Sequence, residues 1–152
     1  MKKRGKFRKG IFAVVYRKEK NNIFYLVLKR KLHWKGWEFP KGGVKGLEFI
    51  KKTVKREIFE ETGQKPVKIL KLSVSGKYSY DREYPERLGY IGQSYRLFAA
   101  EIKDKKIRLD KKEHSAYKWL NFATAFKFLK WINQKKCLKI VNKSLQKNEA
   151  DK

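Results

Sequence analysis

A chain of 152 residues, 41% of them apolar, is long enough for one domain with its own core, which excludes an extended disordered polymer. Lysine and arginine number 41 against 15 acidic residues, and the net charge of +26 favours polyanionic partners, although a generally lysine-rich composition accounts for it equally well. The single cysteine excludes a disulfide framework and no apolar run reaches membrane-spanning length, so we expect a cytoplasmic protein with no membrane partner.

Strand and helix patterns follow one another along the chain. Residues 1–9 form a basic arm, and the two β-branched and aromatic runs that follow predict a β-hairpin. A helical period then ends at Gly63 and Pro66, and Asn121 is an N-cap residue in front of later helical patterns. The predicted strands are 11–16, 23–28, 67–74, 94–102 and 116–120, helical spacing covers 47–62, 121–129 and 138–145, and residues 147–152 form a frayed tail.

No internal repeat or linker divides the chain, so we predict a single domain over 1–152. The mixture of elements indicates the α+β class, with a mixed β-sheet flanked by helices. The sequence carries no signal for an oligomeric state.

Three carboxylates cluster near the end of the helix predicted over 47–62. Glu57, Glu60 and Glu61 stand at i, i+3 and i+4, so their side chains share one helix face. Like charges repel there, and the negative end of the helix dipole disfavours each by roughly 0.3–1 kcal/mol. A divalent cation relieves both penalties, and oxygen ligands select a hard ion such as Mg²⁺ or Mn²⁺.

The rest of this helix follows an amphipathic pattern. An apolar stripe is predicted to anchor it to the core, and the lysines between these positions face solvent. The stripe consists of Leu47, Ile50, Val54 and Ile58.

From the three glutamates alone, a solvated acidic helix end is the more common explanation, but the residues around them favour a metal site. Residues 42–64 resemble the Nudix box, Gly-x5-Glu-x7-Arg-Glu-U-x-Glu-Glu-x-Gly-U, where U is a bulky aliphatic residue. The only departure is Gln64 at the last position, which serves packing and not chemistry in the box. The matching residues are Gly42, Glu48, Arg56, Glu57, Ile58, Glu60, Glu61 and Gly63.

This resemblance implies a loop–helix–loop within a Nudix α/β/α sandwich around a central mixed sheet. It also implies a hydrolase of phosphoanhydrides in which Glu57, Glu60 and Glu61 hold Mg²⁺, with Mn²⁺ as an alternative. Glu48 lies off their face by helical spacing, and we expect it to pair with Arg56 instead. Gly42 and Gly43 would let the backbone approach the phosphates closely.

Two further segments resemble asymmetrical diadenosine tetraphosphate hydrolases, which yield ATP and AMP. The run from Trp34 to Gly43 resembles the segment before the box in these enzymes, and it suggests that Lys41 contacts a phosphate, although a lysine in a loop is common in this chain. Glu113-His114-x4-Trp119-Leu120 resembles a second segment of that subfamily. By this analogy Glu113 is a metal ligand or general base, whereas we expect His114 to be structural.

A competing resemblance lies at residues 89–95, whose Ile-Gly-Gln run is similar to that of bacterial RNA pyrophosphohydrolases. A triphosphorylated RNA 5′ end, bound in part through the basic surface, is therefore the alternative substrate. A non-catalytic RNA-binding Nudix module is a further alternative, but it would not need all three box glutamates.

Recognition of a base in either substrate calls for an aromatic platform. Tyr78, Tyr80 and Tyr84 lie in a polar stretch between predicted strands, and we expect Tyr80 or Tyr84 to stack on the base. Packing of these tyrosines on the loop surface is the plainer alternative for each of them.

Overall fold

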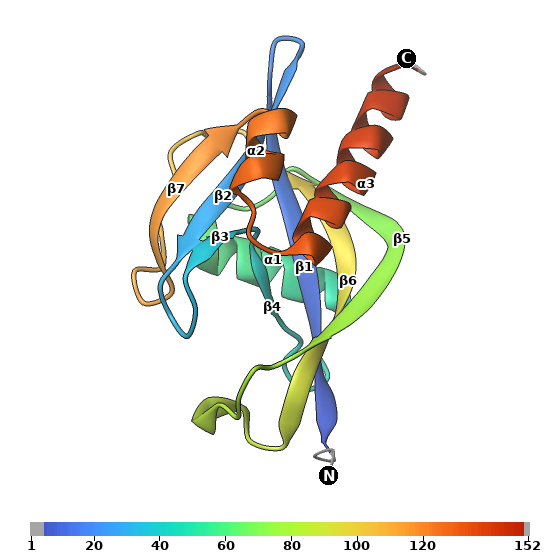
Figure 1. The fold of residues 1–152 in the computed structure, drawn as a ribbon. Coiled ribbons are helices and arrows are strands. Elements are labelled where there is room, and N and C mark those ends of the chain that lie inside the picture. Colours follow the sequence, from blue (N-terminus) through green and yellow to red (C-terminus); the bar gives the residue numbers. More distant parts are fainter. Residues whose placement is uncertain (1–4, 151–152) are drawn as a thin grey trace.

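The computed structural model describes residues 5–150 as one mixed sheet with helices on both faces (Figure 1). The main strand order is β3-β2-β1-β6-β5, with β4 added to β1 and β7 added to β2. The elements are β1 (Lys6–Glu19), β2 (Asn22–Arg30), β3 (Gly36–Glu38), β4 (Lys41–Gly43), α1 (Ile50–Thr62), β5 (Lys68–Ser79), the 3₁₀ turn η1 (Pro85–Arg87), β6 (Tyr90–Glu101), β7 (His114–Leu120), α2 (Phe122–Phe128) and α3 (Ile132–Ala150).

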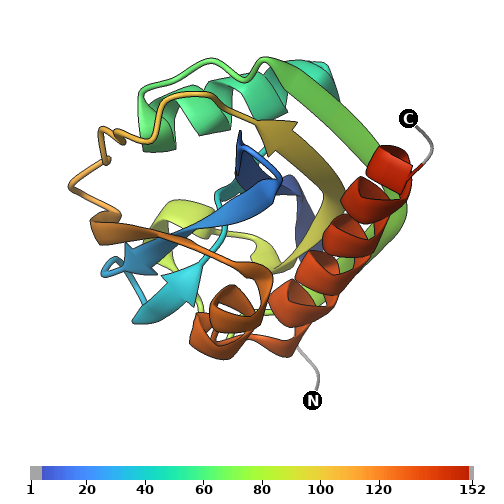
Figure 2. The same cartoon turned by 90° about the horizontal axis from the view of Figure 1, so that it is seen from above.

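Strand β1 separates two apolar layers. Successive side chains of a strand point to opposite faces, so Ile11, Ala13 and Val15 pack on the α1 side of the sheet. Phe12, Val14 and Tyr16 pack on the other side, against residues of α2 and α3. Figure 2 shows α1 and α3 on opposite sides of the sheet, which confirms the predicted α/β/α sandwich.

The predicted hairpin is present, but its first strand begins earlier than the sequence suggested. β1 pairs antiparallel with β2 through a turn at Lys20, whose φ is 55°. Residues 6–9, expected in a basic arm, belong to β1 because they pair in parallel with β6. Of the rest of that arm, Gly5 directly precedes β1, and residues 1–4 lie outside the described residues.

The carboxylate helix begins later than expected. The chain turns at Gly46, where φ is 52°, and Phe49 is extended, so α1 starts at Ile50. Leu47 is consequently exposed and does not belong to the apolar stripe, whereas Val54 and Ile58 are buried as predicted. The helix ends as predicted at Gly63, which takes a φ of 78° and donates its N–H to the Phe59 carbonyl.

The remaining boundaries differ by a few residues. β5 extends to Ser79 because it pairs with β6 beyond an irregularity, and this places Tyr78 in a strand. Asn121 caps α2 as predicted, accepting the Thr124 N–H at 2.9 Å. Helix α3 continues through residues 147–150, expected to be frayed, and residues 151–152 lie outside the described chain. None of the described helices is both long and apolar enough to cross a bilayer.

Candidate active site

Arg56 ties the carboxylate helix to the loop in front of it. Its guanidinium donates to both oxygens of Glu48, at 2.9 and 3.0 Å, and to the Gly43 carbonyl at 2.8 Å. These contacts confirm the predicted pairing of Glu48 with Arg56. The hydrogen bonds from Arg56 and Thr53 lower the pKa of Glu48 to about 2, so Glu48 stays ionised as a loop anchor.

Strand β4 lies directly against the carboxylates because two of its residues have no side chain. A Cβ at Gly42 would stand 2.0 Å from the carboxyl carbon of Glu57. One at Gly43 would stand 2.3 Å from the guanidinium carbon of Arg8. Both glycines therefore serve a close approach of backbone to charged side chains of the protein itself, and neither needs a positive φ. The approach of this backbone to phosphates stays a prediction.

The motif glutamates differ in their exposure. Glu57 is nearly buried and its side chain accepts a hydrogen bond from Arg56 at 2.7 Å, whereas Glu60 is 45% exposed. Burial raises the pKa of Glu57 to about 7 despite the opposing charge of Arg56. Burial, together with the charges of Glu57 and Glu113, raises the pKa of Glu61 well above its usual range. Two carboxyl groups are thus held where ionisation is unfavourable without a cation.

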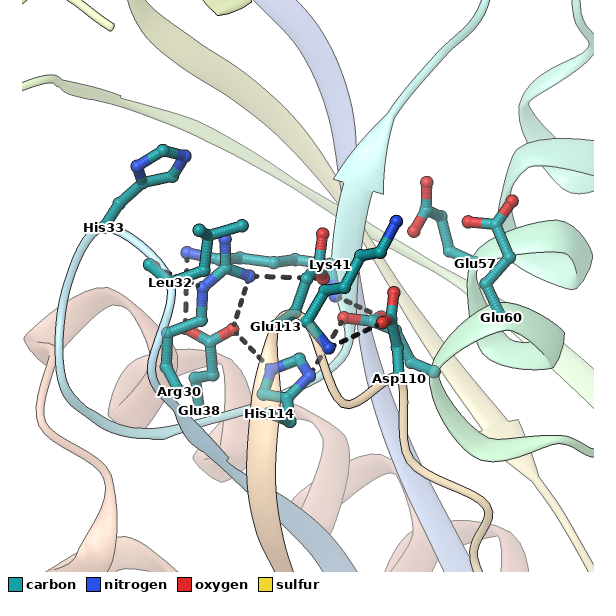
Figure 3. A network of polar contacts seen from close by, with 12 residues as sticks. Arg30, Leu32, His33, Glu38, Lys41, Glu57, Glu60, Asp110, Glu113 and His114 are labelled. Carbon is teal, nitrogen blue, oxygen red and sulfur yellow. Dashed lines mark hydrogen bonds and ion pairs between the residues drawn. The ribbon is translucent and has the colours of Figure 1, made fainter.

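Glu38 forms the centre of a buried polar network beside α1 (Figure 3). Its carboxylate accepts hydrogen bonds from Trp34 at 2.9 Å and from Arg30 at 3.4 Å. One of its oxygens also lies 3.1 Å from the Nε2 of His114. Burial alone would raise the pKa of Glu38, but the charge of Lys41 and the hydrogen bond to His114 lower it to about 2. Glu38 is therefore a buried, fixed negative charge that organises its neighbours.

A second group of ligand-type atoms faces the end of α1. One ligand atom each from Glu61, Glu113 and His114 lies within 4.8 Å of the others. The Oε1 of Glu61 and the Nδ1 of His114 are buried and have no hydrogen-bond partner among the described residues. Unpaired buried polar atoms are costly, and an oxygen and a nitrogen donor facing each other suit a divalent cation. The residues present thus fit a metal ion.

Lys41 connects these features. Its backbone N–H donates to Glu61 Oε2 at 3.2 Å, while its Nζ lies 3.6 Å from Glu38 and 4.2 Å from the centre of the Trp34 ring. Burial lowers the pKa of Lys41, and the attraction of Glu38 opposes that shift. The amino group therefore lies among aromatic rings, on the far side of the backbone from Glu57 (Figure 3).

Two adjoining pockets open at this site, and Lys41 and Tyr78 line both. The first has a volume of about 280 Å³ and is rich in aromatic rings; it is lined by Phe12, Trp34, Lys41, Tyr78, Tyr80, Tyr84 and Trp131, among others. The second has a volume of about 200 Å³ and is rich in charges; it is lined by Arg8, Arg30, Lys45, Arg56, Glu57, Glu60, Arg87, Gln93 and Glu113, among others. An aromatic pocket beside a charged one can hold a base and its phosphates.

The predicted site residues largely come together. Tyr80 and Tyr84 line the aromatic pocket, whereas Glu57, Glu60 and Glu113 line the charged one. Tyr84 is more buried than a stacking platform needs, and its hydroxyl donates to Asp81. Glu61 lies behind the charged pocket, with 1% of its surface exposed.

The sequence reasoning missed Arg8, Arg30, Glu38, Arg87 and Trp131 as parts of the site, and it did not foresee the polar contacts of His114. Glu38 stood within the run from Trp34 to Gly43, so the sequence held a signal for it. The involvement of Arg30 depends on its contact with Glu113, 83 positions away, and that of Trp131 on its contact with the ring of Trp34, so nothing local to either residue indicated it.

Comparisons with known proteins agree with this geometry. The family model for the NUDIX domain matches residues 6–139. An RNA pyrophosphohydrolase of Bartonella bacilliformis is 28% identical over 135 residues, covering 76% of this chain and 78% of the relative. A Nudix hydrolase structure from Listeria monocytogenes superimposes with a TM-score of 0.76 at 24% identity, covering 91% and 94% of the two chains. An Ap4A hydrolase structure from C. elegans, a binary complex, superimposes with a TM-score of 0.72 at 22% identity, covering 91% of this chain and 98% of the other.

At these identities the two structures establish the fold alone. The match to the family model extends over most of the chain and includes the whole carboxylate motif. The chain therefore belongs to the Nudix family, as the motif predicted, and is a hydrolase of phosphoanhydride bonds.

Proposed function

We propose that the protein is a Mg²⁺-dependent hydrolase of nucleoside polyphosphates, with diadenosine tetraphosphate as the preferred substrate and ATP and AMP as products. The observation that carries this proposal is the aromatic pocket adjoining the charged one, with Lys41 and Tyr78 common to both. A base stacked among the rings would direct its phosphate chain toward Glu57 and Glu60.

The metal would be held by Glu57, Glu60 and Glu61, with Glu113 facing it across the charged pocket. When bound, Mg²⁺ polarises phosphoryl oxygens and lowers the pKa of a bound water. The arginines of the pocket, Arg8, Arg30 and Arg87, would bind the remaining phosphate oxygens. Glu113 is 32% exposed and close to Glu61, a position from which it can accept a proton from water.

The proposal is tested by supplying diadenosine tetraphosphate with Mg²⁺ and separating the products. We expect equal amounts of ATP and AMP, and a loss of at least about 100-fold in rate for Glu57→Gln. Glu19→Gln is the matched control, because Glu19 is an exposed glutamate at the end of β1 whose side chain pairs with nearby Arg17. Two molecules of ADP as product, or an unaffected Glu57→Gln variant, would contradict the proposal.

A triphosphorylated RNA 5′ end is the second candidate substrate, favoured by the relative named RNA pyrophosphohydrolase. Gln93, from the run that resembles those enzymes, lines the charged pocket, and its side chain lies 3.4 Å from the Gly42 carbonyl. Turnover of triphosphorylated RNA faster than that of diadenosine tetraphosphate would make RNA the substrate. The non-catalytic alternative requires that neither compound be hydrolysed.

A further inference from the structure

His114 has two ring nitrogens in different surroundings. Nε2 lies 3.1 Å from the carboxylate of Glu38, whereas Nδ1 has no hydrogen-bond partner among the described residues and faces Glu61 Oε1 at 3.9 Å. The ring is fully buried, with 0% exposure, so solvent does not satisfy Nδ1. A buried nitrogen aimed at a buried carboxylate oxygen, beyond hydrogen-bond distance, leaves room for an ion between them.

Glu38 determines which nitrogen is free to bind a cation. A carboxylate accepts hydrogen bonds, so the proton of a neutral imidazole is placed on Nε2, next to Glu38. Nδ1 then presents its lone pair toward Glu61. Histidine ligands of metals commonly donate their other ring N–H to a carboxylate in this way, which fixes both the tautomer and the ring orientation.

The position of Glu38 is itself fixed by several contacts. Trp34, Arg30 and Lys41 all surround its two oxygens, at 2.9, 3.4 and 3.6 Å. Because it is ionised and held from several directions, Glu38 is a rigid acceptor for the imidazole. It therefore acts as a positioning residue for His114.

From this geometry we infer that His114 Nδ1 is a metal ligand, forming with Glu61 and Glu113 a mixed nitrogen–oxygen cation site. Ligand atoms about 2.1 Å from one ion stand about 3–4 Å apart, and the three atoms here lie within 4.8 Å of one another. Small side-chain rotations bring them into one coordination shell. The site shares Glu61 with the metal site of the proposed hydrolysis, and in that respect the inference rests on the proposed function.

An imidazole ligand changes which ion the site prefers. Mg²⁺ favours oxygen ligands, whereas imidazole nitrogen suits transition-metal ions. Mn²⁺ also prefers oxygen and is the weakest binder of that series, but as a transition-metal ion it accepts an imidazole nitrogen more readily than Mg²⁺ does. The site therefore binds Mn²⁺ more tightly than Mg²⁺, by a margin that depends on His114. Removing the nitrogen is expected to reduce the ratio of Mn²⁺ to Mg²⁺ affinity by about tenfold, the lower end of the effect typical for a group close to a metal.

Pulsed electron paramagnetic resonance of the Mn²⁺-loaded protein tests the inference without reference to activity. The chain has two histidines, so nitrogen coupling to Mn²⁺ from an imidazole belongs to His114 or His33. We expect ¹⁴N modulation in the wild-type protein and in the control His33→Gln, and its loss in His114→Gln. The amide of that Gln can still donate to Glu38 and offers no atom at the position of Nδ1. Calorimetric titration with Mn²⁺ and Mg²⁺ gives the affinity ratio for each protein.

Mn²⁺ bound to the wild-type protein without ¹⁴N modulation overturns the inference, and this measurement does not require His114→Gln to fold. Modulation that persists in a folded His114→Gln variant overturns it as well. Failure of the proposed function is a separate result. Wild-type protein that shows the ¹⁴N modulation but hydrolyses neither diadenosine tetraphosphate nor triphosphorylated RNA leaves the metal ligand established and removes the substrate assignment.

Discussion

Gly42 is the residue at which a single added carbon would most directly disturb the carboxylates. Its missing side chain leaves the space that the Glu57 carboxyl occupies, with the imagined Cβ only 2.0 Å from the carboxyl carbon. We expect Gly42→Ala to displace Glu57 and to reduce kcat/KM at least about 100-fold, or about 2.7 kcal/mol of transition-state stabilisation. The rate is measured with diadenosine tetraphosphate at saturating Mg²⁺.

Gly46→Asn is the matched control for this substitution. Gly46 also precedes α1, but a Cβ there meets nothing within 4 Å, and Asn tolerates its φ of 52° better than most residues. We expect its activity to stay near that of the wild type. An active Gly42→Ala variant would show that Glu57 can occupy another position during catalysis.

At the scale of the element, helix α1 places two carboxyl groups where burial disfavours their charged form. The pKa of Glu57 is raised to about 7, so the folded protein binds more protons than the unfolded chain between about pH 4.5 and 7. This contribution to stability is present at low pH and is lost as pH rises through 7. The raised pKa of Glu61 acts in the same direction.

Mg²⁺ binds the ionised carboxylates and offsets this loss at high pH. We therefore expect saturating Mg²⁺ to raise the midpoint of thermal unfolding by several degrees at pH 8 and by much less at pH 5.5. In the Glu57→Gln variant, the rise in unfolding temperature caused by Mg²⁺ is expected to differ less between pH 8 and pH 5.5. Equal stabilisation at both pH values would mean that the ion binds away from these carboxyl groups.

For the whole molecule, three of the cations that contribute to the charge of +26 lie exposed near one another on the α1 side of the sheet. Lys9, Ser94 and Lys77 are aligned across β1, β6 and β5, with Arg96 two residues beyond Ser94. The Nζ of Lys77 lies 4.9 Å from the centre of the Phe7 ring. Exposed cations around a partly exposed ring are suited to a single-stranded RNA backbone, which would favour the second candidate substrate.

Replacing Lys9, Lys77 and Arg96 together by Gln tests this surface. If RNA contacts it, the logarithmic salt dependence of RNA binding falls by about 2, at roughly 0.7 per lost phosphate contact, and affinity falls about tenfold or more. Hydrolysis of diadenosine tetraphosphate is expected to stay unchanged. The control variant replaces three exposed lysines that are scattered over the molecule, Lys20, Lys103 and Lys136, by Gln, which removes the same amount of charge. Equal effects of both triple variants on RNA binding would mean that net charge alone attracts RNA.

The sequence by itself determined the features that depend on residues close together in the chain. The grouping of Glu57, Glu60 and Glu61, the pairing of Glu48 with Arg56 and the stop at Gly63 follow from helical spacing and from the conformational freedom of glycine. The mixture of predicted elements indicated the α+β class, and the resemblance to the Nudix box added the α/β/α sandwich. Even here the start of α1 was wrong, because the chain turns at Gly46, where φ is 52°, and Phe49 is still extended.

Only the tertiary structure decided which distant residues complete the site. Glu38 and His114 are 76 positions apart, and they meet because β3 and β7 pair with opposite edges of β2. Strand register fixes such meetings, and it is set by the packing of the whole sheet, which no local pattern encodes. The sequence indicated a structural role for His114, and its buried contact with Glu38 agrees with that role. Only the folded chain, however, shows that Nδ1 of the same ring faces Glu61 Oε1 at 3.9 Å.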